Sequence, residues 1–286
     1  MNSLSESDEF YVGYLPGVPP AMFTSLKRVL AVIFILVVGI SFLLVFNQRE
    51  FSTADFEFGI PTQLEGIVYK TPVPHLRISL GVSWEGVPIS KTILLVGYGK
   101  SGAAGALKEI EKTSGQSIVG KKVTLNGYLI YGDGKTIFQI TENINRNVNI
   151  TSGTIEPQIS MTDAGRVSVV GEIVDSKCYF GVMKPGEGKP HRSCAIRCIS
   201  GGIPPVFHAA GSNGYYILVN EELESINREV LSLVGDQIEL KGTTLIMDDW
   251  KVLVVNTTEL RSLSKWSSVK QNLLAMEKGM TVCGKN

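Results

Sequence analysis

The sequence has no excess of charge of either sign, because 27 basic residues balance 27 acidic ones. A chain without a net field has no long-range electrostatic attraction to nucleic acid or to anionic lipid. Aromatic residues are also few, at 8% of the chain, and they are scattered. Proteins that bind single strands combine a basic groove with aromatic stacking, and this sequence has no such stripe. We therefore expect no nucleic acid partner.

Cysteine and histidine are scarce, with four and three copies, and the usual cofactor motifs are missing. Covalent haem attachment needs Cys-x-x-Cys-His, and thioredoxin-like exchange is usually supported by Cys-x-x-Cys; neither occurs here. Residues 97–102 (GYGKSG) echo the end of a phosphate-binding loop but lack its leading glycine. No nucleophile–base motif is recognisable either, so the sequence favours a non-enzymatic role and leaves catalysis open.

One long hydrophobic run is present, over residues 29–46, with no charge, no proline and a single glycine. At a rise of about 1.5 Å per residue, such a helix nearly crosses the hydrocarbon layer of a bilayer. The run is longer than the apolar core of a typical signal peptide, and residues 47–51 directly after it offer no small-x-small cleavage pattern. The sequence predicts an uncleaved transmembrane anchor over residues 27–48.

The charges that flank this anchor predict its orientation. Lys27 and Arg28 precede it directly, whereas only Arg49 follows it closely. Under the positive-inside rule, residues 1–26 form a cytoplasmic tail. We therefore expect a single-pass protein of the inner (plasma) membrane, with the bulk of the chain periplasmic or otherwise extracytoplasmic.

The remaining chain contains a pair of similar segments. Residues 119–127 (VGKKVTLNG) align with residues 234–242 (VGDQIELKG), and the match continues without a gap through the turns at 132–134 and 247–249. Such self-similarity indicates an internal repeat. In each copy, strand candidates come first, and each copy ends in a β-hairpin.

A helical stretch is expected at the same place in both copies, over residues 103–112 and 221–233. Strands, then a helix, then a closing hairpin is the order of an OB-type barrel. The predicted fold is therefore mostly β with short helices (α+β), as two tandem OB-like small barrels after the anchor. We place the first OB-like domain at residues 49–155. The second, at residues 156–286, includes a Cys/His insert and a C-terminal helix over residues 260–279.

The insert carries three of the four cysteines. Pro190 before it and Gly201-Gly202 after it are helix start and stop signals, which predict a helix over residues 191–200. His191, Cys194 and Cys198 then share one helical face at i, i+3 and i+7, and Cys178 reaches in from the end of the preceding strand. These four residues make a Cys₃His ligand set.

Soft thiolates with one imidazole suit zinc or copper, and Asp175 is placed to accept a hydrogen bond from a ligand. The alternative is a disulfide from Cys178 to Cys194 or Cys198, as an oxidising exterior would favour. A third interpretation is thiol–disulfide exchange by the thiol left free. His208 could fold back as an extra ligand, whereas His75 is expected to be structural and Cys283 incidental.

The pattern Asp-x-x-Cys from Asp175, then His-x-x-Cys-Ala-x-x-Cys from His191, then Gly-Gly-x-Pro-Pro from Gly201, resembles a core of uncharacterised bacterial membrane-anchored envelope proteins. The resemblance covers residues 170–207. The first copy has none of these ligands. The resemblance implies a site but no named activity.

Two function hypotheses follow. The first is a membrane-tethered extracytoplasmic metal-binding or redox accessory protein with a Cys₃His-type site. The alternative is a non-catalytic structural or assembly subunit of a membrane complex, with a disulfide-stapled insert. In both cases the expected partner is a membrane protein complex or an envelope protein.

Overall fold

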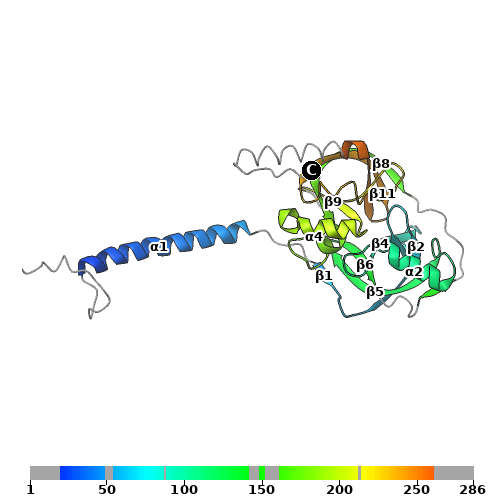
Figure 1. The fold of residues 1–286 in the computed structure, drawn as a ribbon, viewed down its shortest axis with the longest axis horizontal. Coiled ribbons are helices and arrows are strands. Elements are labelled where there is room, and N and C mark those ends of the chain that lie inside the picture. Colours follow the sequence, from blue (N-terminus) through cyan, green and yellow to red (C-terminus); the bar gives the residue numbers. More distant parts are fainter. Residues whose placement is uncertain are drawn as a thin grey trace, which may run out of the picture. The chain divides into compact units, whose positions relative to one another are not determined.

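The computed structural model describes residues 20–48, 54–86, 88–141, 148–151, 161–211 and 214–260. The chain divides into two compact units, residues 1–51 and 52–286 (Figure 1). The predicted cytoplasmic tail up to residue 19, nearly all of the predicted C-terminal helix, and Cys283 lie outside the described residues.

The described part of the first unit is one helix, α1, from Pro20 to Asn47. Its segment Met22–Asn47 has a mean hydropathy of 3.3 and is long and apolar enough to cross a membrane. Proline, which has no backbone N–H, suits the first turn of a helix, because the N–H groups there have no hydrogen-bond partner within the helix. The apolar helix expected near the N-terminus is confirmed, while the side of the membrane and the compartment stay predictions.

The first barrel contains five strands that close on themselves in the order β5-β2-β3-β4-β6. The β4–β6 pair is parallel and the other neighbours are antiparallel. Helix α2 lies between β4 and β5 in the chain, as the OB-type order requires. The elements of this half are β1 (Ala54–Phe56), β2 (Thr62–Tyr69), β3 (His75–Val82), β4 (Pro88–Val96), α2 (Ala104–Ser114), β5 (Lys122–Gly132), β6 (Lys135–Ile140) and β7 (Asn149–Thr151).

The second barrel repeats this strand arrangement. It closes in the order β10-β12-β11-β8-β9, and its β10–β12 pair is the parallel one. Two helices are inserted between its first two strands. Its elements are β8 (Thr162–Asp175), α3 (Ser176–Phe180), α4 (Gly188–Ser200), β9 (Pro205–Ala209), β10 (Tyr215–Val219), β11 (Gln237–Met247) and β12 (Trp250–Val255). The predicted fold of two small barrels is confirmed, whereas duplication of one ancestral unit stays a prediction.

The helix predicted over residues 221–233 is wrong, because the structure has successive turns there. Leu223 takes a positive φ of 58°, which an α-helix does not allow. Ile226, Val230 and Leu233 are nevertheless fully buried in the core of the second barrel. Their spacing correctly indicated that these side chains point into the core. Successive turns bury them as well as a regular helix would.

The two barrels pack on one another through a shared core. One cluster of buried residues combines Leu94 and Ile137 of the first barrel with Phe180 and Val252 of the second. The indole Nε1 of the buried Trp250 donates a hydrogen bond of 3.1 Å to the carbonyl of Thr92, across the interface. The barrels therefore belong to one compact body, and a site between them takes residues from both.

Candidate functional site

The insert begins where β8 ends. Asp175, the last residue of β8, takes an extended conformation and accepts a hydrogen bond from the backbone N–H of Cys178 through Oδ1, at 2.7 Å. Aspartate is a favoured N-cap because its carboxylate satisfies a free N–H in the first helical turn. Cys178 therefore lies in the short helix α3, which follows directly on the end of β8 from which Cys178 was expected to reach the site.

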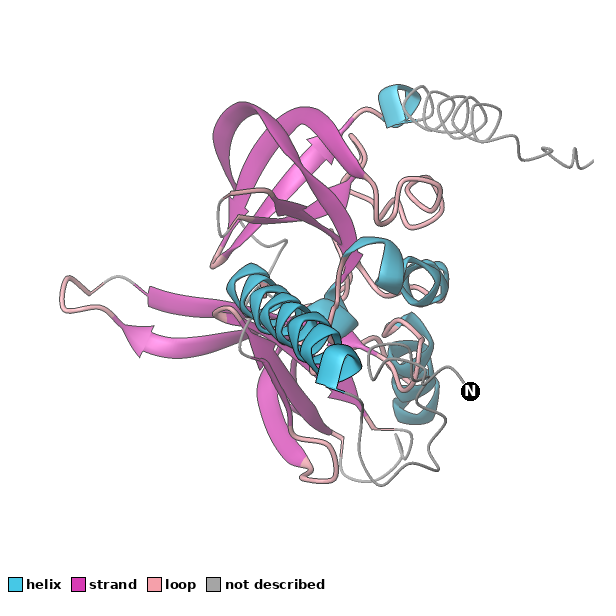
Figure 2. Ribbon diagram, turned by 90° about the vertical axis from the view of Figure 1, so that its left-hand side faces the viewer, coloured by secondary structure: helices cyan, strands magenta, loops and turns pink. Residues whose placement is uncertain are grey.

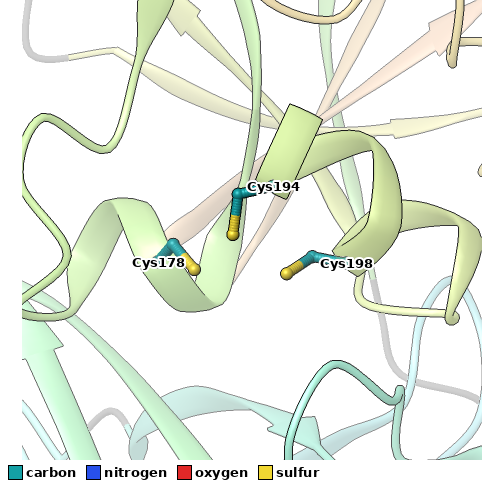
Figure 3. Close-up of side chains that lie close together, drawn as sticks. All are labelled: Cys178, Cys194 and Cys198. Carbon is teal, nitrogen blue, oxygen red and sulfur yellow. The ribbon is translucent and has the colours of Figure 1, made fainter. Parts of the chain in front are cut away.

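The second helix of the insert, α4, carries the other two thiols. It begins at Gly188, three residues before the predicted start, and ends at Ser200 as predicted. Figure 3 shows Cys178 from α3 and both Cys194 and Cys198 from α4, with their sulfur atoms turned toward one another. The three Sγ atoms lie within 4.8 Å of each other. Around a tetrahedral zinc ion, with Zn–S bonds of about 2.3 Å, sulfurs are about 3.8 Å apart, so a small contraction would suffice.

His191 belongs to a second group, with Asp175 and Cys178, whose ligand atoms also lie within 4.8 Å of each other. Its Nε2 is 3.1 Å from Oδ2 of Asp175, and both side chains are buried. The structure therefore gathers all four predicted ligands, but in two groups joined at Cys178. Asp175 connects them, since it caps the helix of Cys178 with one oxygen and contacts His191 with the other.

Hydrogen bonds among the thiols set which one ionises first. The thiol of Cys178 donates to Cys198, and this contact lowers the pKa of Cys198. The same contact raises the pKa of Cys178, with burial as the next cause. Cys198 is therefore the preferred thiolate of the pair. All three described cysteines are free thiols in the structure, without the disulfide from Cys178 that was the alternative to a metal site.

Two lysines that no sequence motif links to the thiols lie at the cluster. Lys100, from the first barrel, donates a hydrogen bond to Sγ of Cys194 at 3.4 Å. Lys177 is nearly buried beside the thiols, and its ammonium donates to the carbonyls of Gly97 and Gly99 at 3.0 and 2.6 Å. Burial lowers the pKa of Lys177 to about 8, although the neighbouring thiols and Asp175 act to raise it.

The loop of residues 97–102, which echoes a phosphate-binding loop in sequence, packs against the end of α4. The N–H of Gly102 donates to the carbonyl of Gly201 at 2.8 Å. A Cβ on Gly102 would lie 2.1 Å from the carbonyl oxygen of Gly202, and one on Gly201 would lie 2.0 Å from that of Lys100. Glycine is needed on both sides because two backbones meet here. The sequence shows both glycine-rich stretches, but no local pattern indicates that they contact each other.

The other two histidines lie outside both groups. His208 contacts Glu187, with Nδ1 to Oε2 at 3.2 Å, and the hydroxyl of Tyr179, so the alternative in which it folds back as an extra ligand is not supported. His75 is fully buried, and its Nδ1 is 2.7 Å from the carbonyl of Val73. Burial lowers the pKa of His75 to about 4, so the ring is neutral near pH 7, as suits a structural residue.

Comparisons with models of protein families, with curated proteins and with solved structures found no match to this chain. The resemblance of the Cys/His core to envelope proteins stays a prediction, and the function is inferred from the geometry of the site.

Proposed function

We propose that this chain is a membrane-tethered accessory protein whose α3–α4 insert binds a soft metal ion, zinc or copper(I), through Cys178, Cys194 and Cys198. The observation that carries the proposal is the convergence of three free thiols from two helices of fixed position. Thiolates select such ions, whereas Mg²⁺ and Ca²⁺ prefer oxygen ligands. The wider role, service to a membrane complex or envelope protein, follows from the anchor and is part of the proposal.

The residues around the thiols favour the loss of protons that metal binding requires. Thiols bind metal as thiolates, so binding releases protons and leaves negative charge in a partly buried place. The lowered pKa of Cys198 provides one thiolate at little cost. The ammonium groups of Lys100 and Lys177 offset the charge of the others.

His191 is the remaining candidate ligand, on the Cys178 side of the cluster. A ligating imidazole in proteins usually contacts a carboxylate through its other nitrogen, which fixes the ring and raises its basicity. Asp175 provides that carboxylate, and it is completely buried. A bound ion would be a soft metal centre here. The three thiolates would hold it, and the two lysines would offset their negative charge.

Partial exposure of the cluster favours an exchangeable ion over a purely structural one. Cys178 and Cys194 are partly exposed, and only Cys198 is buried. Structural zinc sites are closed shells of four protein ligands. An open edge allows a partner to deliver or remove an ion, as an accessory protein requires.

The contact between Cys178 and Cys198 also supports redox exchange as a second candidate. Cys178, the partly exposed thiol of the pair, would pass its proton to the Cys198 thiolate and attack a partner's disulfide, forming a mixed disulfide and releasing one partner thiolate. That thiolate takes up the proton, and Cys198 would then displace the second partner sulfur. The partner disulfide is reduced to two thiols as Cys178 and Cys198 are oxidised to a disulfide.

The test is metal analysis and thiol counting on the full chain, purified in mild detergent without chelator. We expect about one ion per chain, lost in Cys178→Ser and in Cys194→Ser. Cys283→Ser is the matched control and should keep the ion. No metal in a protein with two of its four thiols blocked would overturn metal binding in favour of the redox pair or a stapled docking module. Equal loss in all three variants would refute the assignment of ligands.

A further inference from the structure

The outer half of the β3–β4 hairpin leaves the first barrel as a two-stranded ribbon. Among the described residues, β3 pairs with β2 only as far as Arg77, and β4 pairs with β6 only from Leu94 onward. Between these points the two strands pair with each other, through a bulge at Leu80. Figure 2 shows the ribbon projecting from the barrel.

The end of this hairpin is apolar, and its described apolar side chains are exposed. Trp84 at the turn is 94% exposed, Val82 is 67% exposed and Leu80 is 58% exposed. Within residues 78–90 the only charged residue is Glu85. Large apolar side chains gathered at an exposed tip normally mark an interaction site, because their exposure to water is unfavourable.

The hairpin extends from the same end of the barrel at which the chain arrives from α1. Ala54, the first residue of β1, pairs with Gly132 beside the β5–β6 turn. Strand β4 runs parallel to β6 with Leu94 opposite Ile137, so its first residue, Pro88, lies about 13 Å beyond the start of β6. Lys91 of β4 and Ala54 line one surface pocket.

The chain between α1 and β1 is short. Residues 48–53 separate Asn47 from Ala54, and this distance is at most about 25 Å at full extension. If α1 spans a bilayer, that end of the barrel stays near the membrane surface. An apolar hairpin on the same end is then within reach of the lipid.

We infer that the tip of the β3–β4 hairpin, with Trp84 at its turn, inserts into the interfacial layer of the bilayer in which α1 is anchored. The inference rests on the membrane tether of the proposed function. Tryptophan is enriched at this depth because its ring is apolar and its N–H is polar. Since the tip carries no lysine or arginine, neutral phosphatidylcholine is a sufficient surface, and salt should not weaken the contact.

The experiment uses the full chain reconstituted in phosphatidylcholine vesicles with and without brominated lipid, which quenches nearby tryptophan. The chain has three tryptophans, and Trp84→Phe removes one while it keeps an apolar side chain. Trp250, which is buried, and Trp266, which lies outside the described residues, remain in both proteins. We expect bromine to quench the wild type more than Trp84→Phe, equally at low and high salt.

A second variant, Leu80→Ser with Val82→Ser, should reduce the quenching of Trp84 without changing the unfolding midpoint, since both side chains are exposed. Protein that floats with the vesicles and shows equal quenching in the wild type and Trp84→Phe would overturn the hairpin inference and leave the anchor standing. Protein that fails to float would overturn the anchor, and the hairpin inference with it.

Discussion

Lys100 of the first barrel donates a hydrogen bond to the thiol of Cys194 in the second barrel, at 3.4 Å. The candidate site therefore does not belong to the insert alone. Three thiols come from one barrel, while a cation and two carbonyl groups that hold a second cation come from the other. Any event at the thiols is thereby coupled to the packing of the barrels.

The first prediction concerns this cation. Lys100→Met should weaken metal affinity by about tenfold, because residues that contact and orient metal ligands typically contribute this much. The affinity is measured by competition with a chelator on the full chain in detergent. Lys100→Arg, which keeps the charge, should restore most of the affinity, and Lys108→Met on an exposed face of α2 serves as a control. Unchanged affinity in Lys100→Met would remove the first barrel from the site.

The second prediction separates the two roles of Asp175. Asp175→Asn keeps an oxygen for the N–H of Cys178, and asparagine caps helices about as well as aspartate. The same change removes the negative charge beside His191. We expect metal affinity to fall by about tenfold with little change in stability. Asp175→Ala should lower both, with a loss of about 1 kcal/mol or more in unfolding free energy, measured by denaturant.

The sequence predicted the parts of the fold that depend on local patterns. Uniform apolar composition identified α1, and the match of 119–127 to 234–242 identified two barrels with similar strand order. The start and stop signals at Pro190 and Gly201-Gly202 placed His191, Cys194 and Cys198 on one helix. Each of these features depends on residues that are close in the sequence, so composition and periodicity are enough to predict it.

The remaining parts of the site depend on contacts between distant segments. Lys100 lies 94 positions before Cys194 and has no local motif that marks it as part of a thiol site. Cys178 was expected to reach in from the end of the preceding strand, and the short helix that the Asp175 cap starts there was not predicted. His191 shares a helix with Cys194, yet its ring contacts Asp175, since a buried carboxylate offers a better partner than a thiol.

The third prediction tests the glycine contact that joins the barrels. Gly102→Ala places a methyl group 2.1 Å from the carbonyl oxygen of Gly202, so the loop must move. We expect a loss of about 1–3 kcal/mol in unfolding free energy, the usual cost of forcing an extra methyl group into a packed place. Metal affinity should fall as well, because the same loop positions Lys100 and contacts Lys177.

Gly105→Ala is the matched control for this substitution. It lies three residues later in α2, where an added Cβ meets nothing within 4 Å. Alanine there should stabilise the chain by up to about 1 kcal/mol, since glycine is a poor helix former. Equal effects of the two substitutions would show that the close approach at Gly102 does not contribute to stability.

The last prediction concerns pH and His75, which lies apart from the thiols. Burial lowers the pKa of His75 from 6.5 to about 4, so between these values the unfolded chain binds a proton that the folded chain does not. Stability from the neutral ring is therefore fully present above pH 6.5 and is lost as pH falls toward 4, by roughly 3 kcal/mol. His75→Phe keeps an aromatic ring beside Tyr69, on which the imidazole stacks, but does not titrate. As pH falls from 6.5 to 4, the unfolding free energy of the wild type should decrease by more than that of His75→Phe. Carboxylates titrate in both proteins, so their contribution cancels in the difference. A constant difference from pH 7 to pH 4 would show that His75 is accessible to protons in the folded chain.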